Sequence, residues 1–452
     1  MNVEELFAAL CDRIPDAMAK HKVPGVALGI VFEGREFMRG FGVTNVRHPL
    51  PVDEKTLFQI GSTTKTFTAT AVMRLVEAGT LALDQPIRRY LPDFTMRDPD
   101  VTAKITMRHL LTHTGGWDGD FFPDTGNGDD ALAKYVKLMA DLPQLTKLGT
   151  ILSYNNSAFS LAGRVIEAVT GKTYEATLKE LVLDPLGLRH SFLFPMDAMT
   201  YSYAVGHATI GDKTTVLRPW QVTRACAAAG GIATSMKDQL RYARFHMGDG
   251  TAEDGTHLLS HESMSAMQTP RGPGVLDIKM GLAWMTTEIG GLRRVHHGGG
   301  TFGQISAFTM TPARKFALAL NTNSSSGGLF NLEVTKDLVA KFLGNDAPEP
   351  AEIPMTPAQM TEYSGRYLAT LGDFEIKADA VKLMAQPLPK GGFPTKDTPP
   401  GPPPPPFRIG LIGKDRVAMV EPPIKDIQGE FLRSPDGSIA WLRWGHRIHG
   451  KA

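Results

Sequence analysis

Ser62 and Lys65, which could act together as a nucleophile and its base, are three positions apart in the sequence. In a helix this spacing places both side chains on one face, one turn apart. A serine hydroxyl becomes a good nucleophile only when another group takes its proton, and a lysine can do so when burial and positive charge lower its pKa. Alone, Ser-x-x-Lys is a weak pattern, since most matches are an N-cap serine beside a surface lysine. Here an apolar helix predicted over residues 62–78 places Lys65 near the core.

A second candidate is Tyr154, with Asn156 two positions further on. A phenol can pass a proton between a nucleophile and a leaving group, and an asparagine amide can hold a substrate carbonyl. Taken by itself, Tyr-x-Asn is also compatible with an ordinary loop turn.

The third candidate is the run His297-Gly298-Gly299-Gly300, which follows an apolar segment. A strand rich in glycine lets a substrate backbone approach closely. A backbone N–H just past it can join the N–H of Ser62 as an oxyanion hole. The run also resembles the oxyanion loop of α/β-hydrolase esterases, but the Gly-x-Ser-x-Gly elbow required there does not occur in the chain. We therefore reject that alternative; a plain glycine-rich turn is the other reading.

The predicted elements show how these residues are positioned. Residues 4–20 have the apolar spacing of an amphipathic helix, and a β-hairpin is predicted over residues 26–41. Strands return over residues 292–297, 304–311 and 316–321, with a last helix over 329–343. Helices are predicted between them, near residues 129–140, 157–170, 174–182 and 235–247. The order predicts an α/β fold: an antiparallel sheet closed by both ends of this part, with a helical region inserted.

The chain changes character after residue 345. We predict a first domain over residues 1–345, which contains all three candidate motifs, a linker over 346–356 that is rich in proline and acidic residues, and an antiparallel β-barrel over 357–452. Strands are predicted over 374–377, 381–385, 407–412, 417–420, 430–433 and 439–444. The proline run 402–406 is predicted to be an exposed spacer, with a lid or subunit contact as the alternative.

Composition limits the partners of the protein. The 452 residues carry a formal net charge of +1, so no basic surplus is present to hold nucleic acid. No segment is long and apolar enough for a membrane-spanning helix, and residues 1–6 lack the basic start of a secretory signal, so a cytoplasmic location is expected. Cys11 and Cys226 are predicted to be reduced core residues.

The three candidate motifs occur in the order Ser-x-x-Lys, Tyr-x-Asn and His-x-Gly, and in this the chain resembles the serine β-lactamase-like family. That family includes class C β-lactamases, DD-peptidases, and related esterases and D-aminopeptidases. Segments 23–27, 83–87, 109–116, 184–188 and 229–234 also look like family segments. The resemblance covers residues 5–345.

The resemblance implies roles for the motif residues. Ser62 would form the acyl-enzyme, Lys65 and Tyr154 would move the proton, and Asn156 would bind the substrate amide. The backbone N–H groups of Ser62 and Gly300 would hold the oxyanion. Histidine at 297 replaces the lysine of true β-lactamases, and this form is more similar to the esterase and peptidase branches. With Gly298 and Gly299, His297 would contact substrate.

Three loop residues and two histidines are further candidates for a functional role. Trp117, Asp118 and Asp120 follow the family's loop at the cleft rim, where they could select substrate or be solvated loop residues. His109 and His113 have helical metal-ligand spacing, but the family similarity explains them as packing residues. We expect no metal and no organic cofactor.

The C-terminal segment resembles the lipocalin-like barrel that some peptidase members append, with residues 363–367 as its clearest feature. In such relatives the barrel shapes the cleft or mediates assembly, so a homo-oligomer is possible.

The function predicted from the sequence is a serine esterase or peptidase that acts on a small-molecule or peptide substrate through an acyl-serine intermediate. One alternative is a β-lactamase or DD-carboxypeptidase. Another is a non-hydrolytic, penicillin-binding-like sensor that acylates and does not turn over.

Overall fold

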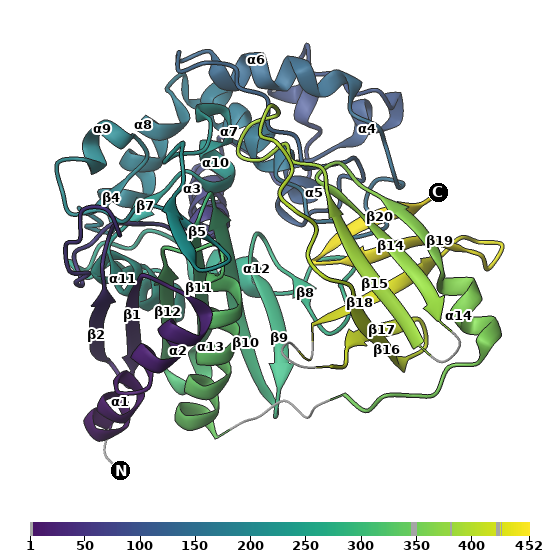
Figure 1. Ribbon diagram of the computed structural model, residues 1–452. Helices are drawn as coiled ribbons and strands as arrows, with labels where there is room; N and C mark the ends of the chain where they lie inside the picture. Colours follow the sequence, from purple (N-terminus) through teal and green to yellow (C-terminus); the bar gives the residue numbers. More distant parts are fainter. Residues whose placement is uncertain (1–2, 345–349, 380–381, 422–424, 426) are drawn as a thin grey trace.

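The structure is a computed structural model that describes residues 3–344, 350–379, 382–421, 425 and 427–452. Three parts are visible in Figure 1: a sheet flanked by helices on the left, a helical region at the top and a barrel on the right. In the described part of the chain, none of the helices combines the length and apolar character needed to cross a bilayer.

The main sheet is antiparallel and joins both ends of the first 344 residues, as predicted. Strands β1 and β12, which come from the two ends of this part, pair as the second and third strands of the sheet, with Val26 opposite Thr322. The strand order is β2-β1-β12-β11-β10-β9-β8 within the described residues. The strands are β1 (Gly25–Phe32), β2 (Arg35–Gly42), β8 (Lys279–Met280), β9 (Met285–Ile289), β10 (Leu292–Thr301), β11 (Gln304–Thr311) and β12 (Phe316–Thr322).

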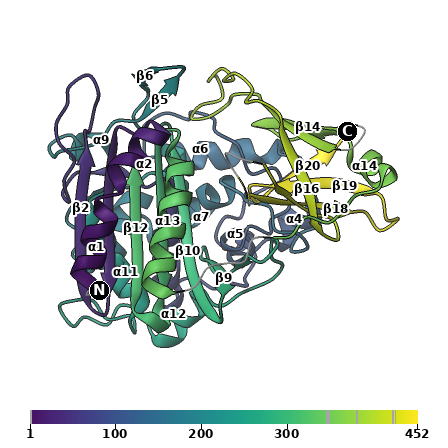
Figure 2. The same ribbon diagram turned by 60° about the horizontal axis from the view of Figure 1, so that its bottom comes forward.

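Helices cover both faces of this sheet, which is why β1 is apolar along its whole length. Side chains of a strand alternate between faces. Val26 and Leu28 therefore pack in the core beneath α13 (Gly327–Leu343), whereas Ala27 and Val31 belong to the core on the opposite face. Figure 2 shows α1 (Val3–Cys11), α2 (Ile14–His21) and α13 in front of the strands, with α11 (Met236–Met247) and α12 (His261–Gln268) behind.

The single helix predicted over residues 4–20 is two helices in the structure, and this prediction was wrong. Helix α1 ends at Cys11 and α2 begins at Ile14, with Pro15 in its first turn. Proline lacks the N–H that a continuous helix would use, so it is well placed only in a new first turn.

The helix that carries Lys65 is buried on nearly all sides, as its apolar sequence predicted. A short 3₁₀ turn, η1 (Gly61–Thr63), leads into α3 (Thr64–Glu77). Its buried threonines are satisfied by carbonyls; Thr68 Oγ1, for example, donates to Ala228 O at 2.7 Å.

The remaining elements form the helical region and two small sheets. The helices are α4 (Pro99–Lys104), α5 (Met107–Leu111), α6 (Ala131–Leu138), α7 (Ser157–Thr170), α8 (Tyr174–Leu178), α9 (Pro195–Ala198) and α10 (Ala227–Gly230). Shorter 3₁₀ or π turns are η2 (Ile87–Arg89), η3 (Met139–Asp141), η4 (Lys179–Leu183), η5 (Arg224–Cys226) and η6 (Pro312–Arg314). The strands are β3 (Phe58–Gln59), β4 (Ser191–Phe192) and β7 (Ala233–Thr234), and the hairpin β5 (His207–Ile210) and β6 (Lys213–Val216).

The C-terminal part is a closed antiparallel barrel in which strands follow one another in chain order, as in up-and-down barrels. Strand β13 closes it by pairing with β20. Both were missed in the sequence because they are short; Val381, at the start of another predicted strand, lies outside the described residues. The elements are α14 (Pro357–Tyr363), β13 (Gly365–Leu368), β14 (Gly372–Asp379), β15 (Lys382–Pro389), β16 (Phe407–Gly413), β17 (Arg416–Met419), β18 (Gln428–Arg433), β19 (Ile439–Trp444) and β20 (Arg447–Lys451).

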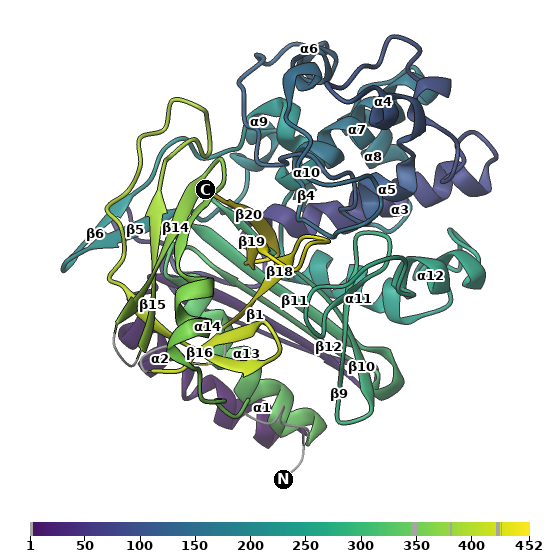
Figure 3. The same cartoon turned by 90° about the vertical axis from the view of Figure 1, so that its right-hand side faces the viewer.

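Several segments of the barrel contact the hydrolase part, among them the β19–β20 turn and the β15–β16 loop; Figure 3 shows the barrel in front of the main sheet. In the β19–β20 turn, Gly445 and His446 both have positive φ, of 55° and 67°, as a two-residue type I′ hairpin turn requires. The carbonyl of His446 accepts a hydrogen bond from Tyr154 N at 2.8 Å. In the β15–β16 loop, Lys396 N donates to Phe122 O at 3.2 Å, while the proline run 402–406 is exposed, as predicted.

Candidate active site

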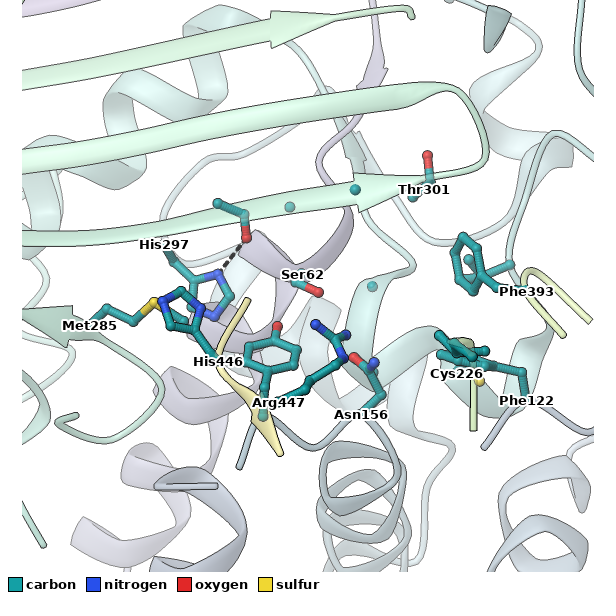
Figure 4. Close-up of a pocket in the computed structure, with 18 of the residues that line it drawn as sticks. Ser62, Phe122, Asn156, Cys226, Met285, His297, Thr301, Phe393, His446 and Arg447 are labelled. Atoms are coloured by element: carbon teal, nitrogen blue, oxygen red, sulfur yellow. Dashed lines mark hydrogen bonds between the residues drawn. The ribbon is translucent and has the colours of Figure 1, made fainter. Parts of the chain in front are cut away.

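A cavity of about 510 Å³ opens where the sheet, the helical region and the barrel meet, and Ser62 lies in its wall. Figure 4 shows that the cavity has two different ends. On one side of Ser62 are His297, His446 and Met285; on the other are Phe122, Phe393 and Cys226. A substrate bound across Ser62 therefore meets imidazoles on one side and an apolar wall on the other.

Lys65 is fully buried and makes three polar contacts, all from Nζ. It lies 2.9 Å from Ser62 Oγ, 2.8 Å from Asn156 Oδ1 and 2.7 Å from Ala229 O. The two carbonyl oxygens can only accept hydrogen bonds. A neutral amine that donates to both must direct its lone pair at the hydroxyl of Ser62, which is the geometry of a general base.

The environment of Lys65 favours this neutral form. Burial, followed by the positive charge of Arg447, holds the pKa of Lys65 well below its usual value, and Asp120 opposes the shift. The arrangement predicted from the Ser-x-x-Lys spacing is thus present, with the lysine in the core.

Tyr154 lies beside both members of the pair, and Lys65 Nζ is 5.0 Å from the centroid of its ring. Its phenol is within hydrogen-bonding reach of Ser62, and burial raises its pKa despite the opposing effects of Ser62 and Arg447. The ring stacks on His113, with centroids 4.3 Å apart. A phenol that keeps its proton at neutral pH is suited to donate that proton to a leaving group.

Asn156 connects the lysine to an acidic residue. Its Nδ2 donates to Asp120 Oδ1 at 2.7 Å, while its Oδ1 accepts from Lys65. Asp120 also forms a bidentate ion pair with Arg447, at 2.5 Å from Nε and 3.2 Å from Nη2. Asn156 thus connects Asp120 to Lys65 through two hydrogen bonds.

The glycine run forms the end of β10 and passes very close to the start of α3. A Cβ placed on Gly299 would lie 2.6 Å from Ser62 N, and one on Gly61 would lie 2.5 Å from Gly300 N. Side chains at either position would separate the two backbone segments. The close approach places Ser62 and Gly300 beside each other in the cavity wall, where the sequence predicts the oxyanion hole.

The β11 strand fixes this approach. Ser306 Oγ donates to Ile60 O at 2.7 Å and accepts from Thr63 Oγ1 at 3.1 Å. These bonds tie the residues on both sides of the nucleophile to the sheet.

His297 is neutral in this site. Burial lowers its pKa to about 3, with Lys65 contributing in the same direction. Its Nδ1 donates to Gly298 O at 2.6 Å, which leaves Nε2 as an acceptor that is buried and has no partner among the described residues. Residue 297 therefore offers a neutral hydrogen-bond acceptor at the cavity wall.

The barrel adds residues that the sequence did not point to. His446 comes from the β19–β20 turn and Arg447 from the start of β20, and Leu371 and Phe393 come from loops at the same end of the barrel. Arg447 also lies over the ring of Tyr154, 4.9 Å from its centroid. No local pattern identified these residues; the resemblance to peptidases whose barrel shapes the cleft was the available signal.

Several residues that the sequence raised as candidates do not line the cavity, among them Trp117, Asp118, Asp120 and His113. Trp117 is 1% exposed and donates through Nε1 to Ser157 Oγ at 2.8 Å, and the described residues that line the cavity do not include it. His113 accepts a hydrogen bond from Asn155 N at 3.0 Å, a packing role. Cys11 and Cys226 are both buried and free, as predicted.

The fold and the Ser62–Lys65 pair together define a β-lactamase-like serine hydrolase architecture. The Beta-lactamase family model matches residues 11–344, and the chain belongs to this family.

Particular relatives narrow the comparison. The chain is 33% identical to penicillin-binding protein 4 of Amycolatopsis lactamdurans over 76% of this chain and 93% of that protein. It is 25% identical to the unguisins hydrolase ungD of Aspergillus violaceofuscus over 75% of this chain and 64% of that protein. The crystal structure of SurE is similar over 98% of both chains, with a TM-score of 0.76 and 27% identity. A second SurE structure, with D-Leu, gives a TM-score of 0.73 with 26% identity over 98% of this chain and 99% of that one.

Proposed function

We propose that this protein is a serine esterase or peptidase that cleaves an ester or amide bond through an acyl-Ser62 intermediate. The observation that carries the proposal is the contact of Lys65 Nζ with Ser62 Oγ at 2.9 Å, in a site where the other two partners of the amine are carbonyl oxygens. This arrangement leaves the lone pair free to take the serine proton.

The reaction follows from these positions. Ser62 Oγ attacks the substrate carbonyl and its proton passes to Lys65, while the N–H groups of Ser62 and Gly300 stabilise the oxyanion. The bond to the leaving group breaks as Tyr154 supplies a proton to it, and Lys65 returns its proton toward the phenol. Water then attacks the acyl-serine ester by the same route in reverse and releases the acid.

The acyl part of the substrate is proposed to carry an apolar side chain on a D-configured residue. Phe122 and Phe393 pack edge to face, with centroids 5.0 Å apart, beside Cys226 and Leu371. Burial of an apolar group against this wall would stabilise the bound acyl group. The D-Leu in the SurE structure is an apolar residue of the proposed kind.

The proposal is tested by incubating the protein with a p-nitrophenyl short-chain ester, a pair of D-leucyl and L-leucyl p-nitrophenyl esters, a D-alanyl p-nitroanilide and nitrocefin. We expect turnover of the esters or the anilide, preference for the D-leucyl member of the pair, and a mass increase of one acyl group on Ser62 in intact-protein mass spectrometry. Preferred turnover of nitrocefin would favour a β-lactamase instead. Acylation without turnover would favour the sensor.

The apolar wall makes a second prediction. Phe393→Ala should lower kcat/KM by about tenfold for an ester with a D-leucyl or hexanoyl group, and by less than about twofold for the acetyl ester, because only the larger groups reach the wall. Phe194→Ala is the matched control, since that ring lies outside the cavity and is 38% exposed. Equal losses for all three esters would contradict the assignment.

A further inference from the structure

Asp120 lies in the loop that follows Trp117, and it is 7% exposed. Its two oxygens accept hydrogen bonds from the side chains of Asn156 and Arg447. Asn156 comes from the loop that leads into α7, and Arg447 from β20 of the barrel. A single carboxylate thus joins the helical region, the barrel and the neighbour of the catalytic lysine.

The orientation of the Asn156 amide depends on this carboxylate. An ionised carboxylate only accepts hydrogen bonds, so the group that faces Asp120 must be the NH₂ of the amide. The amide oxygen then faces Lys65 and accepts from Nζ at 2.8 Å. With the amide reversed, its NH₂ would compete with Ser62 for the lone pair of the neutral lysine.

Among the described residues, the charged groups that act on Lys65 are the ion pair of Asp120 and Arg447. The titratable groups of the described residues that surround Lys65 or interact with its charge are His113, Asp120, Tyr154, Cys226, His297 and Arg447. Burial lowers the pKa of the two histidines and raises that of the tyrosine and the cysteine, which keeps all four neutral near pH 7. The field at Lys65 is therefore set by Asp120 and Arg447, which oppose each other.

We propose that Asp120 is a positioning residue for acylation: it acts through Asn156 to hold the amide oxygen on Lys65, while Arg447 of the barrel balances its charge. The inference rests on the proposed function and adds that docking of the barrel is part of the activation of Ser62. A barrel that merely covered the cleft would not be electrostatically coupled to the lysine.

The two charged residues should act on Lys65 in opposite directions. Arg447→Gln leaves the carboxylate unbalanced, which stabilises the ammonium form, raises the pKa of Lys65 and moves the acid limb of the pH profile to higher pH. Asp120→Asn leaves the guanidinium unbalanced, which lowers the pKa of Lys65 and moves the acid limb to lower pH. A shift of about one pH unit is expected in each case.

The readout is the rate at which an alkyl fluorophosphonate labels Ser62, measured from pH 5 to 10, because it needs no knowledge of the natural substrate. Asp238→Asn is the matched control: Asp238 is a buried carboxyl group that accepts hydrogen bonds from the backbone N–H of His190 and the hydroxyl of Ser191, and it is not among the described residues that line the cavity. Asparagine keeps an acceptor oxygen there while it removes the charge. Its acid limb is expected to stay in place.

A second measurement distinguishes the effect of Asp120 on the orientation of the Asn156 amide from the effect of its charge on Lys65. At the pH optimum, Asp120→Asn should slow labelling by about tenfold in the wild-type background, and by about twofold or less in an Asn156→Ala background, since the two residues act as one unit. Asp120→Glu should recover part of the lost rate.

The outcomes are distinguishable. If wild-type protein is not labelled at Ser62, both the proposed function and this inference are wrong. Labelled wild-type protein with shifts of the same sign, or with no shift, in the two variants would overturn this inference alone, as would equal losses in both backgrounds. If Asp120→Asn does not fold, the sign of the shift in Arg447→Gln decides.

Discussion

Replacement of Ser62 by alanine is expected to lower kcat/KM by about 10⁴-fold or more for every ester and amide that the protein turns over. In the proposed reaction the hydroxyl forms the covalent bond to the acyl group, so its removal would leave substrate binding and the oxyanion hole but no nucleophile. The variant should also lose the acyl mass increase and the fluorophosphonate label, while its melting temperature stays close to that of the wild type because Ser62 lies in the cavity wall.

The matched control for this variant is Ser364→Ala. That hydroxyl donates to Met360 O at 2.7 Å at the end of α14, and Ser364 is not among the described residues that line the cavity. Its loss should leave turnover within about twofold of wild type, the range expected away from the site. Turnover that survives in Ser62→Ala at a level near that of Ser364→Ala would show that another group is the nucleophile.

Replacement of Lys65 by methionine should lower kcat/KM by about 10³-fold, within the range for loss of a general base. Methionine fills a similar volume and removes only the amine that contacts Ser62, Asn156 and the carbonyl of Ala229. The exposed Lys341, which bonds to Asp337 at 3.0 Å, supplies the control variant Lys341→Met. Full activity in Lys65→Met would assign the base to another residue.

The same variant makes a prediction about stability. The pKa of Lys65 is lowered in the folded protein and returns to its usual value of 10.5 in the unfolded chain. Between these values the unfolded state binds more protons, so wild-type stability gains from this group as pH rises toward 10.5. Lys65→Met lacks that gain. The melting temperature of Lys65→Met minus that of wild type should therefore be larger at pH 6 than at pH 10. If this difference instead increases with pH, the pKa of Lys65 is not lowered in the folded protein.

Much of the fold was predictable because the spacing of apolar residues along the chain indicates its longer elements. The apolar run of β1, the hairpin to β2 and the buried α3 follow from spacing along the chain, and the structure has them. The break between α1 and α2 depended on Pro15, and the strands β13 and β20 are too short to give a pattern. Short elements of this kind are held by their barrel neighbours, which a local pattern does not specify.

By itself, the sequence determined that Ser62 and Lys65, the proposed nucleophile and base, lie side by side, because they are one helical turn apart and need no other element to bring them together. It also determined that the glycines of 298–300 allow a close backbone approach. Only the tertiary structure decided that Arg447 meets Asp120, 327 positions away in the chain, and that Phe393 closes the apolar end of the cavity. The reason is physical: a spacing of three residues is fixed by the helix, whereas the contact between a barrel turn and a loop of the hydrolase part depends on how two packed bodies dock.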